Sequence, residues 1–473
     1  MNNSEEKPVH MTPEEFRSAG YAAIDWLVDY LKEIEERPVT SEVEPGEVRS
    51  SLPEHAPETG EPFQDLLDDM DRIIAPGVTQ WQHPGFYGYF PANSSPPAVL
   101  GDLLSTGLGV NGMLWATSPA ATELETHVLD WLIDLCGIPK RFHSSGAGGG
   151  VIQDSASSAT LCAILAARHR INRPEEIMKL RAYVSNQAHS SAEKGLLVAG
   201  IHHQNIRLIE TDENLSMCLK SLEKAISEDV ETGYLPFFVM TTVGTTSSGA
   251  VDNVEEIAKL ATQAGAWIHV DAAWAGSATI CPEFRGILNG LDLADSYAFN
   301  PHKWMLTNFD CSAFFVADAK PLTEALSIVP EYLRNSASEA GEVIDYRDWQ
   351  VPLGRRFRAL KLWFVLRSYG AETIRTYIRR HVKAANWFAE QINEHPKLKL
   401  SVAPSLSLVC FQHVEGDRAS EQLLAALNAT QKVLLTHTRL NNKYVLRVAV
   451  GGTYTTLEHV ESLMQLISEY LDN

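Results

Sequence analysis

Short apolar runs alternate with longer amphipathic ones between Pro96 and Phe315, and no other feature constrains the fold of this chain more. The apolar runs are rich in β-branched and aromatic residues, which indicates short strands buried on both faces. Amphipathic runs such as residues 254–264 separate them and indicate the helices that connect parallel strands. The pattern therefore predicts an α/β fold around a mostly parallel sheet. The predicted strands are residues 183–184, 206–209, 237–243, 267–270 and 314–316.

The two ends of the chain follow other patterns. Apolar residues recur at helical spacing over residues 13–36, and a second helix is predicted near residues 63–74. After about residue 371, a helix over 373–394, weaker strands and a final helix indicate a smaller α+β unit. We therefore predict an N-terminal helical segment (residues 1–95), a large α/β domain (96–370) and a small C-terminal α+β domain (371–473). The N-terminal helices cover either the chain's own core or another subunit.

Composition restricts the partners. The chain has 60 acidic and 39 basic residues, a net charge of -21, which argues against a nucleic acid or an anionic membrane as partner. Residues 1–10 lack the apolar core of a signal peptide, and no apolar run is long enough to cross a bilayer. The six cysteines lack paired spacing, so neither disulfides nor a zinc site is indicated. These features predict a cytoplasmic protein.

Two segments of the central part carry the chemistry. Asp271 follows the predicted strand 267–270, and Lys303 follows a strand-like run at 296–299, after a turn at Pro301. In an open α/β sheet, ligands bind at the C-terminal ends of the strands. A carboxylate and a lysine amine at this edge suit pyridoxal phosphate, because the carboxylate keeps the pyridine nitrogen protonated and the amine condenses with the aldehyde. A lone lysine in such a turn is usually solvated, but the pair predicts this cofactor.

A phosphate site is predicted near the same edge. Residues 155–158, Ser-Ala-Ser-Ser, open a helical run at 159–170, and the free N–H groups and dipole of a helix N-terminus attract anions. The alternative is a plain serine cap. The glycine-rich residues 146–150 lack the dinucleotide-binding pattern, and we interpret them as a flexible turn.

With further blocks, these segments resemble the group II pyridoxal phosphate decarboxylases, and within them the aromatic L-amino acid decarboxylases. The resemblance runs from about Met11 to the last helix. It implies the aspartate aminotransferase-like fold (PLP fold type I) and a homodimer that shares its active sites between subunits, with the N-terminal segment (1–95) packed across the dimer interface. Its most specific blocks are residues 43–46, 89–91, 118–125, 187–191, 310–312 and 352–358.

The resemblance also implies a role for individual residues at the cofactor. Lys303 would carry it, Asp271 would pair with its ring nitrogen, and the imidazole of His189 would stack on its ring and contact the substrate carboxylate. Tyr332, in a segment (328–341) that we interpret as a mobile loop, would close over the partner subunit's site and protonate the substrate α-carbon. The other implied cofactor contacts are Ala156, Ser157, Thr246, Ala273, Asn300 and His302.

The implied substrate contacts fall into two groups. Asn111 and Met113 would reach in from the partner subunit, and Gly354 would lie at the floor of the ring pocket. At that position some plant relatives restricted to phenolic substrates carry serine, whereas those that accept indoles carry glycine. The remaining implied contacts are Tyr89, Phe90, Pro91 and Ala92.

The implied activity is decarboxylation of aromatic L-amino acids, of the tryptophan, 5-hydroxytryptophan, dopa, tyrosine or phenylalanine type, to an arylalkylamine and carbon dioxide. One alternative is an aromatic acetaldehyde synthase, an oxidative member of the same fold. Members of that kind typically alter the position matching His189 or Tyr332, and both are intact here. A third possibility is a non-catalytic binding protein, which the complete set of site residues disfavours.

Overall fold

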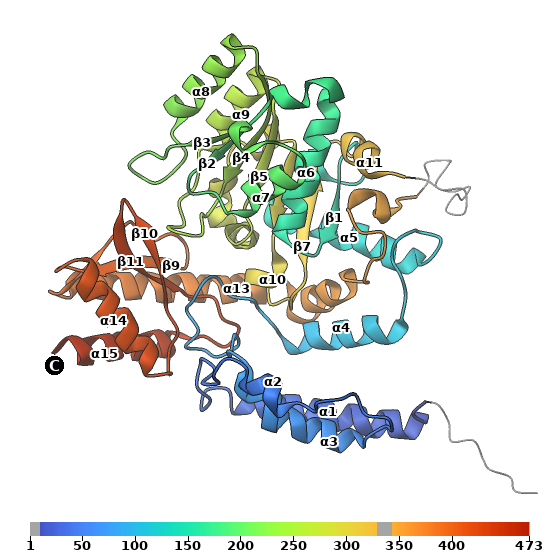
Figure 1. The fold of residues 1–473 in the computed structure, drawn as a ribbon, viewed down its shortest axis with the longest axis vertical. Coiled ribbons are helices and arrows are strands. Elements are labelled where there is room, and N and C mark those ends of the chain that lie inside the picture. Colours follow the sequence, from blue (N-terminus) through green and yellow to red (C-terminus); the bar gives the residue numbers. More distant parts are fainter. Residues whose placement is uncertain (1–9, 329–342, 473) are drawn as a thin grey trace, which may run out of the picture.

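The computed structural model describes residues 10–328 and 343–472. Its centre is a seven-stranded sheet of order β1-β7-β6-β5-β4-β2-β3, in which only β7 runs against the other strands (Figure 1). The mostly parallel α/β fold predicted from the alternation of apolar runs is therefore confirmed. The strands are β1 (Gly149–Gln153), β2 (Leu180–Ser185), β3 (Ile206–Ile209), β4 (Leu235–Thr242), β5 (Trp267–Asp271), β6 (Ser296–Phe299) and β7 (Ser312–Val316).

Helices cover both faces of this sheet. Alternate residues of β4 enter different apolar cores: Val239 packs in the core that includes α5 and α9, whereas Phe238 and Met240 pack in the core under α6 and α7. Because both faces are buried, the strands read as continuous apolar runs. The covering helices include α5 (Pro119–Cys136), α6 (Ala156–Ile171), α7 (Ser191–Val198), α8 (Leu219–Glu231), α9 (Val254–Gln263) and α11 (Lys320–Leu326).

The interpretation of residues 146–150 as a flexible turn is wrong in its second half, because Gly149 and Gly150 begin β1. A Cβ on Gly149 would lie 2.7 Å from the Trp349 ring, and one on Gly150 would lie 2.7 Å from the Phe315 ring. These glycines therefore allow close packing at the edge of the sheet. From one sequence, glycines that permit close packing look the same as glycines of a flexible turn.

A second, antiparallel sheet of order β10-β11-β9-β8 lies towards the C-terminus (Figure 1). The long helix α13 (Ala359–Glu394) runs between the two sheets and is interrupted at Gly370, whose φ of 70° is not helical. The α+β character expected of this part is present, although β8, β10 and α14 were not predicted. The elements are β8 (Leu398–Leu400), β9 (Leu408–His413), β10 (Thr436–Leu440), β11 (Lys443–Ala449), α14 (Asp417–Ala429) and α15 (Leu457–Asp472).

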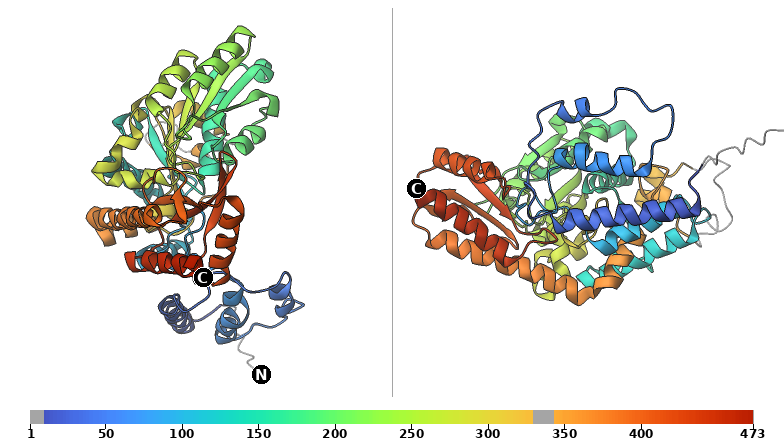
Figure 2. Two further views of the ribbon diagram at one scale, coloured as in Figure 1. Left: turned by 90° about the vertical axis from the view of Figure 1, so that its left-hand side faces the viewer. Right: turned by 90° about the horizontal axis from the view of Figure 1, so that it is seen from below.

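The N-terminal helices lie to one side of both sheets (Figure 2). Helix α1 (Pro13–Lys32) begins with a capping box between Thr12 and Glu15, and none of its residues is buried. None of the residues of α2 (Glu47–Ser51) or α3 (Phe63–Asp69) is buried either. Helix α4 (Pro96–Leu108) returns the chain to the body. No helix within residues 10–328 and 343–472 has the length and apolarity of a membrane span.

Candidate active site

One pocket lies at the C-terminal ends of β4, β5 and β6, the edge at which α/β sheets bind ligands. Every residue implied as a cofactor contact lines it, although they come from segments far apart in the sequence. They are Ala156, Ser157, His189, Thr246, Asp271, Ala273, Asn300, His302 and Lys303.

Lys303 belongs to the short helix α10 (Pro301–Trp304), which follows β6. Burial lowers the pKa of its amine; Asp271 opposes this shift, and Arg447 adds to it. A lowered pKa favours the neutral amine, the form that attacks a carbonyl carbon. Lys303 therefore has the protonation behaviour of a nucleophile.

Asp271 is the last residue of β5, and one of its carboxylate oxygens, Oδ1, accepts a hydrogen bond of 2.9 Å from the backbone N–H of Ala273. Thr242, paired with Asp271 across β4 and β5, also lines the pocket. The Thr242 hydroxyl is buried, and no group of the described residues bonds to it. Because buried hydroxyls are normally paired, this hydroxyl is suited to a ligand that carries polar atoms.

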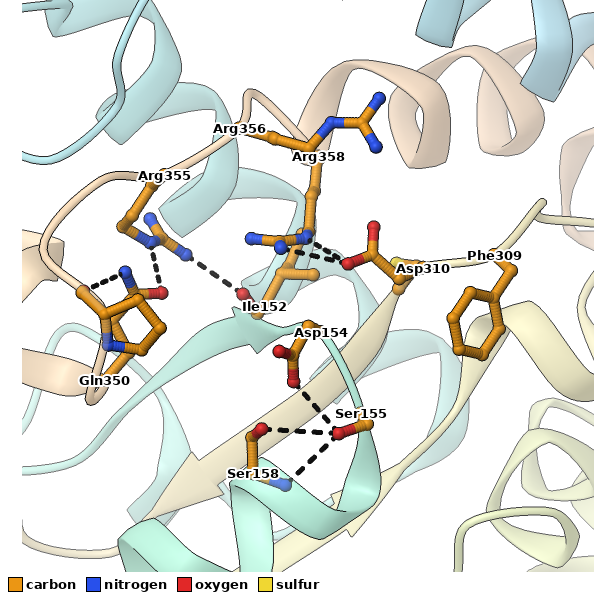
Figure 3. Close-up of polar contacts among 12 residues, drawn as sticks. Ile152, Asp154, Ser155, Ser158, Phe309, Asp310, Gln350, Arg355, Arg356 and Arg358 are labelled. Atoms are coloured by element: carbon orange, nitrogen blue, oxygen red, sulfur yellow. Dashed lines mark hydrogen bonds and ion pairs between the residues drawn. The ribbon is translucent and has the colours of Figure 1, made fainter. Parts of the chain in front are cut away.

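The phosphate end of the pocket is the N-terminus of α6. The Ser155 hydroxyl caps the helix, since it accepts from the Ser158 N–H (3.3 Å) and lies 2.9 Å from a carboxylate oxygen of Asp154 (Figure 3). The serine cap and the phosphate site are therefore compatible. Ala156 and Ser157, in the first turn, line the pocket with backbone N–H groups that no preceding turn can pair.

Two histidines of the pocket are held by backbone groups. The Nδ1 atom of His189 accepts from the Ser191 N–H (3.2 Å), and that of His302 accepts from the Cys311 N–H (2.9 Å). An accepting Nδ1 leaves the ring proton on Nε2. Burial lowers the pKa of His189 and lowers that of His302 to about 3, so both rings are neutral at pH 7.

These side chains fit pyridoxal phosphate. The pocket offers a lysine amine of lowered pKa, a carboxylate at a strand end, a helix N-terminus and an unpaired buried hydroxyl. Each corresponds to one feature of the cofactor, namely its aldehyde, its ring nitrogen, its phosphate and its other polar atoms.

Comparison with known proteins leads to the same cofactor. The model of the pyridoxal-dependent decarboxylase conserved domain matches residues 45–414. The chain belongs to this family. It is a pyridoxal 5'-phosphate-dependent carboxy-lyase, and the predicted resemblance to the aromatic L-amino acid decarboxylases is confirmed.

Three known proteins match this decarboxylase over nearly its full length. Phenylacetaldehyde synthase of Arabidopsis thaliana is 46% identical over 97% of this chain and 96% of its own. Aromatic-L-amino-acid decarboxylase of Rattus norvegicus is 46% identical over 95% of this chain and 96% of its own. The crystal structure of Oryza sativa TDC with PLP and tryptamine superposes with a TM-score of 0.95 at 38% identity, over 98% of each chain.

The residues implied as substrate contacts lie in two places. Phe90 lines the pocket, and its neighbour Tyr89 is 56% exposed; Pro91 and Ala92 continue the same segment. Asn111, Met113 and Gly354 are absent from the lining of this pocket. Tyr332 lies outside the described residues.

Arg355, the residue after Gly354, has a buried side chain that bonds to several groups around it (Figure 3). The Arg355 guanidinium donates to both carboxylate oxygens of Glu125 (2.7 and 3.1 Å), to the Ile152 carbonyl (3.0 Å) and to the Gln350 side chain (2.9 Å). Its backbone N–H donates to the Asn111 side-chain oxygen (3.0 Å). The Met113 carbonyl accepts from the Arg347 N–H.

The sequence interpretation missed Arg447, on β11. Its guanidinium lies 5.3 Å from the centre of the Phe90 ring and donates to the Tyr89 carbonyl (3.1 Å). The Lys303 amine lies 5.7 Å from the centre of the same ring. The sequence did contain a signal for this residue, an arginine within the apolar run of residues 444–450. A charged residue in a buried strand is rare unless it is paired, so it is a candidate for a structural or functional role.

Proposed function

We propose that this chain decarboxylates aromatic L-amino acids, of the tryptophan, 5-hydroxytryptophan, dopa, tyrosine or phenylalanine type, to the arylalkylamine and carbon dioxide. The observation that carries the proposal is that Lys303, Asp271 and His189 line one pocket of a chain so similar to the rat aromatic-L-amino-acid decarboxylase. The tryptamine in the rice TDC structure supports the inclusion of indoles among the substrates. We further propose that the enzyme is a cytoplasmic homodimer.

The cofactor contacts follow from the pocket. Lys303 would bind the aldehyde carbon, Asp271 would pair with the ring nitrogen, and the N–H groups of Ala156 and Ser157 would bind the phosphate. Thr246, Ala273, Asn300 and His302 complete the surroundings of the cofactor. When bound, pyridoxal phosphate supplies an acceptor for the electrons released as the carboxylate leaves.

The chain's own residues position charges and protons around this acceptor. Asp271 would keep a proton on the ring nitrogen, which would strengthen its electron withdrawal. His189, whose Nδ1 accepts from the Ser191 N–H and leaves the proton on Nε2, would stack on the ring and donate to the substrate carboxylate. We assign protonation of the α-carbon to Tyr332 on the family resemblance alone.

A second copy of the chain completes the substrate pocket in this proposal. Asn111, Met113 and Gly354 would form the wall that contacts the ring of the substrate bound in the partner subunit. Exposed apolar side chains support such an assembly: Leu103 and Leu108 of α4 are 53% and 62% exposed, and Phe16 and Tyr21 of α1 are each 67% exposed.

The similarity to phenylacetaldehyde synthase favours one alternative, oxidative decarboxylation to an aromatic aldehyde. We place simple decarboxylation first because the family's oxidative members typically alter the position of His189 or Tyr332, and neither is altered here. Purified enzyme should release carbon dioxide and amine from tryptophan, tyrosine or dopa. Hydrogen peroxide and ammonia would instead identify the aldehyde synthase, and no product would identify a binding protein.

The assignment of Lys303 has its own test. Borohydride reduction of the holoenzyme should fix the cofactor to the peptide that contains Lys303, and Lys303→Ala should abolish both the label and decarboxylation. A label on another lysine would refute the site. Lys194, four residues before the end of α7, is outside the pocket, so Lys194→Ala is a suitable control.

A further inference from the structure

Phe309 forms part of the wall of the cofactor pocket, yet little of its own side chain is packed. Its ring centre lies 4.5 Å from that of His302, and 62% of its side chain is exposed. A ring so exposed contributes little to fixing its own position. The two residues beside it, Asn308 and Asp310, must therefore hold this part of the chain.

Both neighbours are bound to charged groups, which lie on α4 and just before the start of α13. One carboxylate oxygen of Asp310, Oδ2, accepts two hydrogen bonds from Arg358, at 2.9 and 3.1 Å (Figure 3). The Asn308 side-chain amide donates to Asp102 on α4, at 3.2 Å. Arg356 also donates to Asp102, at 3.3 Å. The segment that carries Phe309 is thus anchored at both ends to one group of charges.

Lys361 lies at the centre of this group. Helices α4 and α13 approach so closely here that a Cβ on Gly101 would be 2.7 Å from the Cα of Lys361. The Lys361 side chain is completely buried, with its nitrogen 3.7 Å from an Asp102 oxygen and 3.9 Å from Asp310 Oδ1. Burying an ammonium group is costly unless opposite charges surround it, and these two carboxylates supply them.

Three buried polar atoms of Lys361 and of the residues beside Phe309 make no hydrogen bond within the described part of the chain. No group of the described residues hydrogen-bonds to the Lys361 ammonium, to Asp310 Oδ1 or to the Asn308 side-chain oxygen, and all three atoms are buried. Asn308 and Asp310 are the residues on either side of Phe309.

We propose that Lys361 is a positioning residue for the cofactor pocket: through its two carboxylate neighbours, Asp102 and Asp310, it fixes residues 308–310 and so holds Phe309 against His302. The proposal rests on the role proposed for His302 at the cofactor. Lys361 touches neither substrate nor cofactor in this account, and its effect is transmitted by Asn308 and Asp310.

Hydrogen–deuterium exchange of the apoenzyme tests this role without using catalysis. Lys361→Met removes the charge but keeps the length of the side chain, and Asn308→Ala removes one end of the network. Amides of residues 306–310 should exchange roughly tenfold faster in either variant, with β4 and β5 unchanged. Lys383→Met, an exposed lysine on the same helix, is the matched control and should exchange like the wild type.

The holoenzyme provides a second readout. Visible circular dichroism of the bound cofactor should change in Lys361→Met and not in Lys383→Met, because only the first alters the wall beside His302. If Lys361→Met does not fold, the exchange of residues 306–310 in Asn308→Ala tests the proposal instead. Unchanged exchange at 306–310 in a folded variant, or equal acceleration in every segment, would overturn the role of Lys361 and leave the proposed function untouched.

Discussion

Gly354 lies beside Asn111: a Cβ built on Gly354 has the Asn111 side-chain nitrogen as its nearest neighbour, at 3.8 Å. The Asn111 oxygen accepts from the backbone of Arg355, the next residue along the chain. The two side-chain positions therefore belong to one surface. If Asn111 contributes to the partner's substrate pocket, Gly354 contributes to the same pocket.

Gly354→Ser should discriminate against indoles. A Cβ at this position meets no atom of residues 10–328 and 343–472 closer than 3.8 Å, so the fold should be retained. In the substrate pocket it would oppose the larger bicyclic ring by roughly 1 to 3 kcal/mol. Comparing kcat/KM for tryptophan and tyrosine should show a larger loss for tryptophan. Equal losses for both amino acids would contradict the placement of Gly354 in the ring pocket.

Arg447→Met should make cofactor capture require a higher pH. Arg447 is one of the groups that lower the pKa of the Lys303 amine, so its removal should raise that pKa and reduce the neutral fraction at a given pH. The rate at which the apoenzyme binds pyridoxal phosphate, followed by absorbance, should show a midpoint displaced to higher pH. Arg447→Lys keeps the charge and should keep the wild-type midpoint. The same midpoint in all three proteins would show that Arg447 does not act on Lys303.

The sequence predicted the parts of the site that depend on local pattern. Asp271 ends β5 and Lys303 follows β6 as expected, because a buried strand and a proline-fixed turn are both readable from neighbouring residues. Ser155 caps α6, which the serine and the following helical run indicated.

The parts of the site and of the fold that the sequence did not predict depend on contacts between segments that are distant in the sequence. Arg447, on β11, lies over the ring of Phe90, which lines the pocket, and Lys361 meets Asp102 across two helices that are far apart in the sequence. Strand β10 was missed because its burial is mixed and its residues, Thr-His-Thr-Arg-Leu, carry little apolar signal. Such relationships follow from the topology, and neither spacing nor composition reveals them.

Breaking the buried ion pair of Glu125 and Arg355 should destabilise the protein. Both side chains are at most 2% exposed, so Glu125→Leu leaves a buried guanidinium without its counter-charge, at a cost of about 3 to 5 kcal/mol. Urea unfolding of the apoenzyme measures this loss. The double variant Glu125→Leu/Arg355→Met should recover part of it, because no unpaired charge remains. Glu283→Leu, which breaks a half-exposed pair with Arg379, is the control and should cost far less.

His381 should make stability depend on pH below neutrality. It accepts from the Trp304 indole N–H through Nδ1 (3.0 Å), and Nε2 lies 3.2 Å from the Thr455 carbonyl, so the neutral ring satisfies both partners. Burial lowers its pKa from 6.5 to about 4.

Between these two pKa values the unfolded chain binds a proton that the folded chain does not. The free energy of unfolding should therefore fall as pH decreases through this window, by up to about 1.4 kcal/mol per pH unit for one histidine. His381→Asn should reduce the slope of unfolding free energy against pH by this amount, measured by urea unfolding of the apoenzyme between about pH 4.5 and 6.5. His269 and His302, whose pKa values burial also lowers, and Asp252, whose pKa burial raises to about 6, contribute equally to both proteins and cancel in the comparison. His202→Asn, at an exposed site, should leave the slope unchanged, and an unchanged slope in His381→Asn would show that the buried ring does not resist protonation.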